Sequence, residues 1–181
     1  MKKIYLLFFV LLTAFAAQAQ TSNQKGDLFL NAGVGIGTYG ATNLSIPPIT
    51  VSADYTLKDK LFDEYSSLSA GAYLGYYGTS SSYGAFSSRW SNFLLGGRGA
   101  VHYSFVDKLD TYAGLMLGYD IVSYTTKGEL RSVNLNDSSS NGNFIFSAFV
   151  GARYFFTETI GAYAEIGYGL SALELGVSFK F

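Results

Sequence analysis

The chain has 181 residues, enough for one domain but too few for a second sizeable core. Its formal net charge is −1 and only 14% of its residues are charged, which gives no electrostatic reason to expect a nucleic-acid partner. The chain contains no cysteine, so a disulfide framework and a lipoprotein acylated at its N-terminus are both excluded.

The first 19 residues have the layout of a signal peptide. Lys2 and Lys3 form a positively charged n-region, an apolar stretch follows at residues 4–15, and residues 17–19 (Ala-Gln-Ala) match the small-x-small pattern that signal peptidase cleaves. The apolar stretch is short for a membrane-spanning helix, although a retained N-terminal anchor is the alternative. We predict a signal peptide at residues 1–19. Its removal with Lys2 and Lys3 leaves ten basic residues against thirteen acidic ones.

The rest of the chain is rich in Gly, Tyr and Phe and has no apolar run of about 18 residues, which excludes a helical membrane protein. Instead, apolar residues alternate with small or polar ones at the period of two that indicates β-strands. A transmembrane strand needs about 9–11 residues, and the alternating segments are of this order. In chain order they are 27–38, 49–57, 67–78, 90–105, 111–124, 143–156, 160–168 and 173–181.

The last segment shows the alternation most clearly. Leu173 and Leu175 share one face, and Glu174 and Gly176 lie on the other. The polar faces hold glycine, serine and single charges, whereas the solvated face of a soluble sandwich or lipocalin-like barrel is normally rich in Lys and Glu. The pattern therefore favours apolar side chains that face lipid. We predict an all-β fold, an eight-stranded antiparallel up-and-down transmembrane β-barrel, over residues 20–181.

The links between the segments alternate in length. Short links are expected at 58–66, 106–110 and 157–159, and longer ones, rich in Ser, Asn, Gly and Thr, at 39–48, 79–89 and 125–142. Short turns of outer-membrane barrels face the periplasm and long loops face outside, so we expect a cell outer-membrane protein with both mature termini in the periplasm. Aromatic girdles would mark the two interfaces: Tyr55, Tyr103, Phe105, Tyr154, Phe156, Phe179 and Phe181 on the periplasmic side, and Tyr76, Tyr119, Phe144 and Tyr168 on the outer side.

Several stretches resemble a known family. The C-terminal stretch GAYAEIGYGLSALELGVSFKF, which closes with Phe181, resembles the end of outer-membrane β-barrel proteins, whose terminal aromatic residue belongs to the insertion signal read by the barrel-assembly machinery. The segments GGRGAVHYSF, DTYAGLMLGYD and FSAFVGARYFFTETIGAYAE resemble the porin-like outer-membrane barrels of Bacteroidetes-type bacteria. The resemblance implies a barrel similar in size to the OmpA transmembrane domain and to OmpX. It implies the barrel domain only, without the peptidoglycan-binding domain of full OmpA proteins.

The alternation directs seven charged side chains into the predicted lumen, namely Asp54, Arg98, Asp120, Arg153, Glu165, Glu174 and Lys180. Eight strands enclose an interior just wide enough for side chains, and an unpaired charge there would be costly. We therefore predict that Arg98 and Arg153 pair with Glu165 and Glu174, which would make a structural charge network that plugs the barrel. The alternative is a narrow constriction that selects or gates a permeating solute.

The single histidine offers a possible catalytic site. His102 and Ser104 share a strand face, and their spacing resembles the His-x-Ser pair of the outer-membrane lipid A deacylases. Phe105 stands where that family has asparagine, and the pair lies near the periplasmic end rather than the outer leaflet. A lone lumenal histidine without a catalytic role is the better interpretation. No His/Cys/Asp/Glu cluster has the spacing of a metal site, and we expect no cofactor.

The longer links offer a possible contact surface. They contain Tyr39, Tyr83, Phe86 and Trp90, which could meet an extracellular ligand or form simple solvated connections.

We predict a non-enzymatic outer-membrane barrel with a structural or surface-interaction role and a plugged lumen. A small porin for passive diffusion is the alternative, and a lipid A-modifying enzyme is a minor one. The expected partners are outer-membrane lipid and lipopolysaccharide, the barrel-assembly machinery during insertion, and a possible ligand at the outer loops.

Overall fold

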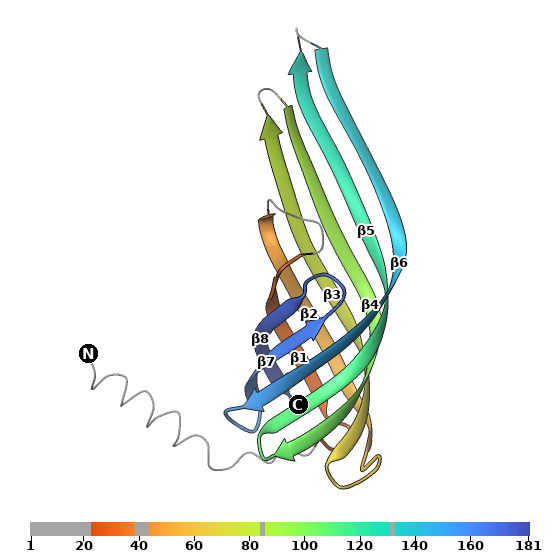
Figure 1. The fold of residues 1–181 in the computed structure, drawn as a ribbon, viewed down its shortest axis with the longest axis vertical. Helices are drawn as coiled ribbons and strands as arrows, with labels where there is room; N and C mark the ends of the chain where they lie inside the picture. The colour runs from red at the N-terminus through yellow and green to blue at the C-terminus, as the bar shows by residue number, and fades with distance from the viewer. Residues whose placement is uncertain (1–22, 39–43, 84–85, 131–132) are drawn as a thin grey trace, which may run out of the picture.

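The computed structural model describes residues 23–38, 44–83, 86–130 and 133–181. The predicted signal peptide and Tyr39 lie outside these residues. Eight strands pair antiparallel with their sequence neighbours, and β1 also pairs with β8, so the sheet closes into a barrel and the predicted fold class is confirmed (Figure 1). The strands are β1 (Leu28–Ile36), β2 (Leu44–Asp59), β3 (Ser66–Tyr83), β4 (Phe86–Val106), β5 (Leu109–Leu130), β6 (Val133–Phe155), β7 (Ile160–Gly167) and β8 (Leu173–Lys180). No helix in the described part of the chain is long and apolar enough to cross a membrane.

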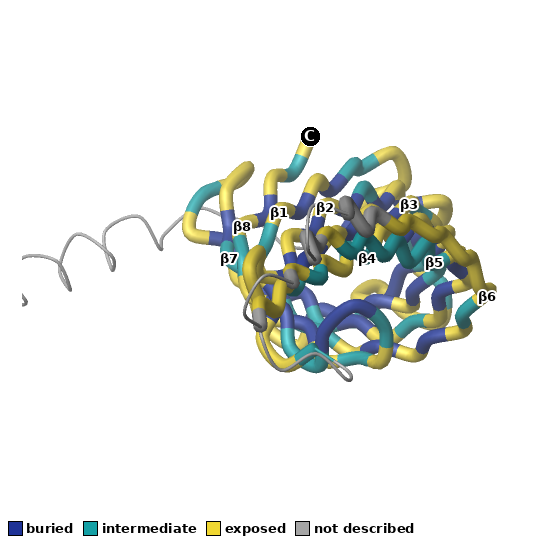
Figure 2. The backbone as a smooth tube through the Cα atoms, turned by 90° about the horizontal axis from the view of Figure 1, so that it is seen from above, coloured by how far each residue is buried: buried dark blue, intermediate teal, exposed yellow. Residues whose placement is uncertain are grey.

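The period-two pattern determines which side chains face the lumen. Along β1, Leu30 and Val34 are exposed on the outside, and Asn31 between them is buried inside. Figure 2 shows this alternation of buried and exposed positions around the ring. Large apolar side chains therefore cover the outer surface. The residues predicted for the two aromatic girdles lie on this outer face, and all except the half-buried Tyr103 are exposed.

The barrel wall is uneven in height. Strands β3 to β6 extend well beyond the others and form a tall curved sheet on one side (Figure 1). β2 follows β3 only as far as Thr79, and β7 pairs with β6 only from Phe149 onward. We call the protruding part, the described residues of 79–92 and 120–143, the wing. The opposite end of the barrel carries Asn23, the first described residue, together with Phe181 and the links at 60–65, 107–108 and 156–159, and is called the turn end.

The wing corrects part of the sequence prediction. The segments 79–89 and 125–142 were expected to be loops, but the strand ladder continues through them, and the last described pairs are Tyr83 with Phe86 and Leu130 with Val133. The expected link at 39–48 is also shorter, because β2 already begins at Leu44. Both faces of the wing are open to solvent, so its Ser, Thr and Asn residues lack the apolar alternation that identifies a half-buried strand.

Inward-facing glycines leave room for large rings in the lumen. A Cβ added to Gly151 would lie 2.4 Å from Cζ of Tyr112, and one added to Gly114 would lie 2.4 Å from Cζ of Phe149. Both rings belong to buried side chains, so neither has space to move aside. These glycines are therefore required by the packing of the barrel interior.

We expect Gly151→Ala to lower the free energy of unfolding by about 1–3 kcal/mol, because the new methyl group overlaps the Tyr112 ring. Gly97→Ala is the matched control, since a Cβ at Gly97 meets no atom within 4 Å, and we expect a change of at most about 0.5 kcal/mol. Urea unfolding in lipid vesicles measures both. Equal effects of the two substitutions would contradict this account of the packing.

Candidate functional site

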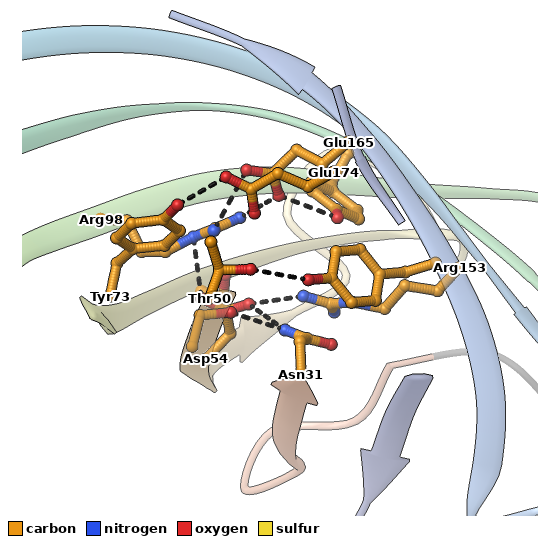
Figure 3. Close-up of polar contacts among 12 residues, drawn as sticks. Asn31, Thr50, Asp54, Tyr73, Arg98, Arg153, Glu165 and Glu174 are labelled. Carbon is orange, nitrogen blue, oxygen red and sulfur yellow. Dashed lines mark hydrogen bonds and ion pairs between the residues drawn. The ribbon is translucent and has the colours of Figure 1, made fainter. Parts of the chain in front are cut away.

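The lumen contains a connected network of charged side chains (Figure 3). Arg98 from β4 is the first of its two buried cations. Its Nε is 3.1 Å from Oδ1 of Asp54, and its two terminal nitrogens reach Glu165 at 2.7 and 3.3 Å. The guanidinium also stacks over the Phe149 ring, with 4.0 Å between Cζ and the ring centroid. The two hydrogen bonds to Glu165 and the contact with the Phe149 ring stabilise the buried Arg98 cation in place of water.

Arg153 from β6 is the second buried cation. Its Nη2 contacts Oδ2 of Asp54 and its Nη1 is 3.3 Å from Oδ2 of Asp110. The prediction that Arg153 pairs with Glu165 or Glu174 is therefore wrong. The register explains the difference, because Arg153 lies directly opposite Asp110 on β5, whereas Glu165 lies opposite Gly151, two residues nearer the wing.

Glu174 was predicted to pair with an arginine, and this prediction is wrong. It lies opposite Glu165 on the neighbouring strand, and Arg98 binds Glu165 instead. Glu174 accepts hydrogen bonds from the hydroxyl groups of Tyr73 and Ser171. The two neighbouring carboxylates thus have different partners: Glu165 binds the Arg98 guanidinium and the Tyr112 hydroxyl group, whereas Glu174 binds hydroxyl groups only.

Two of the predicted network residues lie apart from the arginines. Asp120 is at the base of the wing, where its Oδ2 accepts a hydrogen bond of 3.3 Å from Asn92. Lys180 lies at the rim of the turn end, and its Nζ is 2.8 Å from Oδ2 of Asp27. Phe181 follows it and is 70% exposed, and its backbone forms hydrogen bonds with Leu28 of β1.

His102 pairs with residues that the sequence analysis did not select. Its Nε2 is 2.8 Å from Oγ of Ser69, and its Nδ1 is 3.0 Å from Oδ2 of Asp110. The expected partner, Ser104, is replaced by Ser69 on the neighbouring strand. The order Ser–His–Asp is that of a nucleophile, a base and an orienting carboxylate. Ser69 is only 2% exposed, however, so a substrate has no approach to its hydroxyl group in this conformation.

Asn23, which precedes β1, packs over the turn end of the lumen. Asn23, which is itself buried, donates hydrogen bonds from Nδ2 to Asp110 at 3.0 Å and to Ser67 at 3.4 Å. Asp110 therefore contacts Asn23, His102 and Arg153. Asp110 falls in an expected link of the sequence, but its alternation in phase with the inward Tyr112 is the signal that identifies it as lumenal.

The link between β7 and β8 packs against the lumen on the wing side. Leu170 in this link is buried against an apolar cluster that includes Tyr73, Leu94 and Met116. A cavity of about 20 Å³ remains beneath the link, which is room for about one water molecule. Within the described part of the chain, no group of three or more His, Asp or Glu side chains could hold a metal ion.

We expect Arg153→Met to lower the free energy of unfolding by about 3–5 kcal/mol, because Asp54 and Asp110 would lose a buried counter-charge. Lys180→Met is the control at the rim, where loss of the pair with Asp27 should cost at most about 1 kcal/mol. Urea unfolding monitored by heat-modifiable gel migration measures both. A loss for Arg153→Met as small as that of the control would refute a supporting role for the network.

Two solved structures share this fold. One is Ail, the attachment invasion locus protein of Yersinia pestis, in complex with the heparin analogue sucrose octasulfate. It has a TM-score of 0.54 and 11% sequence identity, and the match covers 87% of this chain and 100% of the Ail chain. The other comes from the de novo design of transmembrane β-barrels, with a TM-score of 0.51, 16% identity, and coverage of 89% of this chain and 100% of that one. At these identities the likeness shows the fold alone.

The family is shown by the sequence itself. None of the curated proteins matches the chain at a significant level. The family model described as the outer membrane protein beta-barrel domain, however, matches residues 7–181, nearly the whole chain. Together with the closed eight-stranded barrel and its apolar outer surface, this match establishes that the chain belongs to the outer-membrane β-barrel protein family.

Proposed function

We propose that this protein is a non-enzymatic outer-membrane barrel that acts through its surface and does not conduct solutes. The filled lumen carries the proposal. Arg98 and Arg153 are locked to Asp54, Asp110 and Glu165 across the interior, and the cavity described above holds about one water molecule. A small porin would need a continuous aqueous path, which these side chains occupy.

We further propose that the wing faces the outside of the cell and that both mature termini face the periplasm. The support is the difference in length between the extended strands at one end of the barrel and the short links at the other. Short turns of outer-membrane barrels are periplasmic, and long extensions are external. A signal peptide at residues 1–19 would direct export, and Phe181 would serve the barrel-assembly machinery during insertion. The bilayer partners would be outer-membrane lipid and lipopolysaccharide, and the resemblance to Bacteroidetes-type porin-like barrels belongs to the same proposal.

The wing is the part suited to interaction. It presents a sheet of polar residues, with Trp90 and Tyr124 in contact on one face. The similar barrel Ail is described as an attachment protein and was crystallised with a heparin analogue, which supports a role of this kind for a barrel of this shape. We propose that an external ligand binds at the wing.

Lipid A modification is the function that the Ser69–His102–Asp110 contacts would favour. The nucleophile would have to receive an acyl group of a membrane lipid, yet Ser69 lies inside a filled lumen and faces away from the bilayer. The same three side chains bind Asn23 and Arg153 through Asp110, which is the arrangement of a structural network. We therefore propose no enzymatic role for them.

In planar lipid bilayers we expect the purified protein to show no stable open state, because the lumenal ion pairs block a water column. Liposome-swelling rates should match those of protein-free vesicles, with an open general porin as the positive control. Long-lived conductance steps of the wild-type protein would overturn the proposal of a closed barrel.

Because the chain contains no cysteine, single substitutions can test the orientation. We expect Ser138→Cys in the wing to react with a membrane-impermeant maleimide on intact cells. Glu158→Cys in a link of the turn end should react only after the outer membrane is permeabilised. Both positions are exposed in the structure, so the reagent reaches either one once it is on the same side of the membrane. The reverse labelling pattern would place the wing in the periplasm and remove the proposed role.

A further inference from the structure

We infer that the lumen-side face of the wing is a binding site for an uncharged saccharide. The inference rests on the proposed function, since it names the class of ligand for which the wing would be the contact surface. It is carried by an exposed aromatic pair, by a frame of polar side chains around that pair, and by the distribution of charge between the two faces of the wing.

The aromatic pair lies on the same face as the lumenal side chains. Trp90 shares the alternation of Arg98 on β4, Tyr124 shares that of Tyr112 on β5, and the register between these strands is unbroken along the wing. Trp90 and Tyr124 lie directly opposite each other, with ring centroids 4.3 Å apart. Trp90 is 46% exposed and Tyr124 is half-buried. Their rings form an apolar platform in a polar sheet, of the kind on which the C–H face of a sugar ring stacks.

Polar side chains lie around this platform on the same face, where Val122 is the apolar neighbour of Tyr124 along β5. Asn92 donates a hydrogen bond of 3.3 Å to Asp120, which fixes the orientation of both groups. Ser139 lies opposite Tyr124, and Asn143 lies opposite Asp120 on β6. Planar amide and carboxylate groups beside an exposed ring match a sugar, whose vicinal hydroxyl groups both donate and accept hydrogen bonds. An isolated exposed aromatic residue would need no ligand to explain it, but this combination indicates one.

The charges divide between the two faces of the wing. Among the side chains that the structure describes there, the lumen-side face carries Asp120 and Asp137 and no cation, whereas the exposed Arg89 and Lys127 have the opposite alternation and lie on the outer face. A sulfated or phosphorylated sugar would be repelled by the aspartates next to the aromatic platform. The face that carries the aromatic pair therefore fits an uncharged saccharide, and a polyanion would find its counter-charges only on the opposite face.

The single tryptophan of the chain reports on this site directly, since Trp90 is the only one. The full-length protein is titrated with maltotetraose and cellotetraose in a detergent without a sugar headgroup, and sucrose octasulfate serves as the anionic probe. We expect at least one uncharged tetrasaccharide to give a saturable blue shift of the Trp90 emission. Sucrose octasulfate should give no saturable shift.

The variants test the face of the wing that binds. We expect Tyr124→Ala to weaken binding of the tetrasaccharide by about tenfold, because it removes half of the stacking surface and leaves the reporter in place. Arg89→Ala and Lys127→Ala on the opposite face are the matched controls and should change the affinity by less than about twofold. Heat-modifiable migration shows that each variant is folded.

The outcomes separate this inference from the proposed function. If no tetrasaccharide shifts the emission, or if Tyr124→Ala binds as well as wild type, the saccharide site is refuted. If sucrose octasulfate binds and Arg89→Ala with Lys127→Ala abolishes its binding, the outer face is the contact surface and the ligand is a polyanion. That result also refutes the saccharide site but keeps the proposed function. Maleimide labelling of Ser138→Cys on intact cells tests the proposed function independently of any sugar.

Discussion

The Asp54 carboxylate connects the two buried arginines, and the rest of the lumen is arranged around it. One of its oxygens contacts Arg98 and the other contacts Arg153. Two guanidinium groups in an interior without bulk water would repel each other and lose their hydration, so each needs a second carboxylate as well. Glu165 supplies it for Arg98 and Asp110 for Arg153. Five strands, β2, β4, β5, β6 and β7, each contribute a member. Through Asp54 the network links β2 to β4 and β6, with which β2 shares no backbone ladder.

This network has consequences for the backbone. The guanidinium groups lie against the rings of Phe149 and Tyr112, and those rings occupy the space above Gly114 and Gly151. These two glycines are therefore explained by the bulk of the aromatic side chains that pack against the arginines. Leu170 and Asn23 are buried toward the two ends of the lumen, and the side chains between them support the closed barrel that we propose. In such a closed barrel, any activity toward other molecules is located outside the lumen.

The architecture could be predicted from the sequence more accurately than the side-chain contacts could. Strict alternation identified eight strands and the inward direction of Arg98 and Arg153, because a closed barrel in lipid imposes one apolar face on every strand. The pairing of Arg153 depended on its register opposite Asp110, which alternation alone does not specify. His102 met Ser69 for the same reason, since a neighbouring strand supplied the hydroxyl group. The alternation did not reveal that the wing consists of two hairpins, because both of its faces are solvated and carry similar residues. Ser138 and Ser139, for example, lie on opposite faces but do not differ in polarity.

The absence of an apolar face in the wing is also what gives Trp90 and Tyr124 their significance. In the membrane-spanning part of the barrel an outward aromatic ring is explained by lipid, and an inward one by packing around the arginines. Neither explanation applies to a ring pair on the open lumen-side face of the wing, where the neighbouring side chains are Ser, Thr, Asn and Asp together with Val122. The fold buries the pair only in part, since Trp90 is 46% exposed and Tyr124 is half-buried. A ligand that covers the rings and engages the neighbouring amides supplies the burial that the protein itself does not provide.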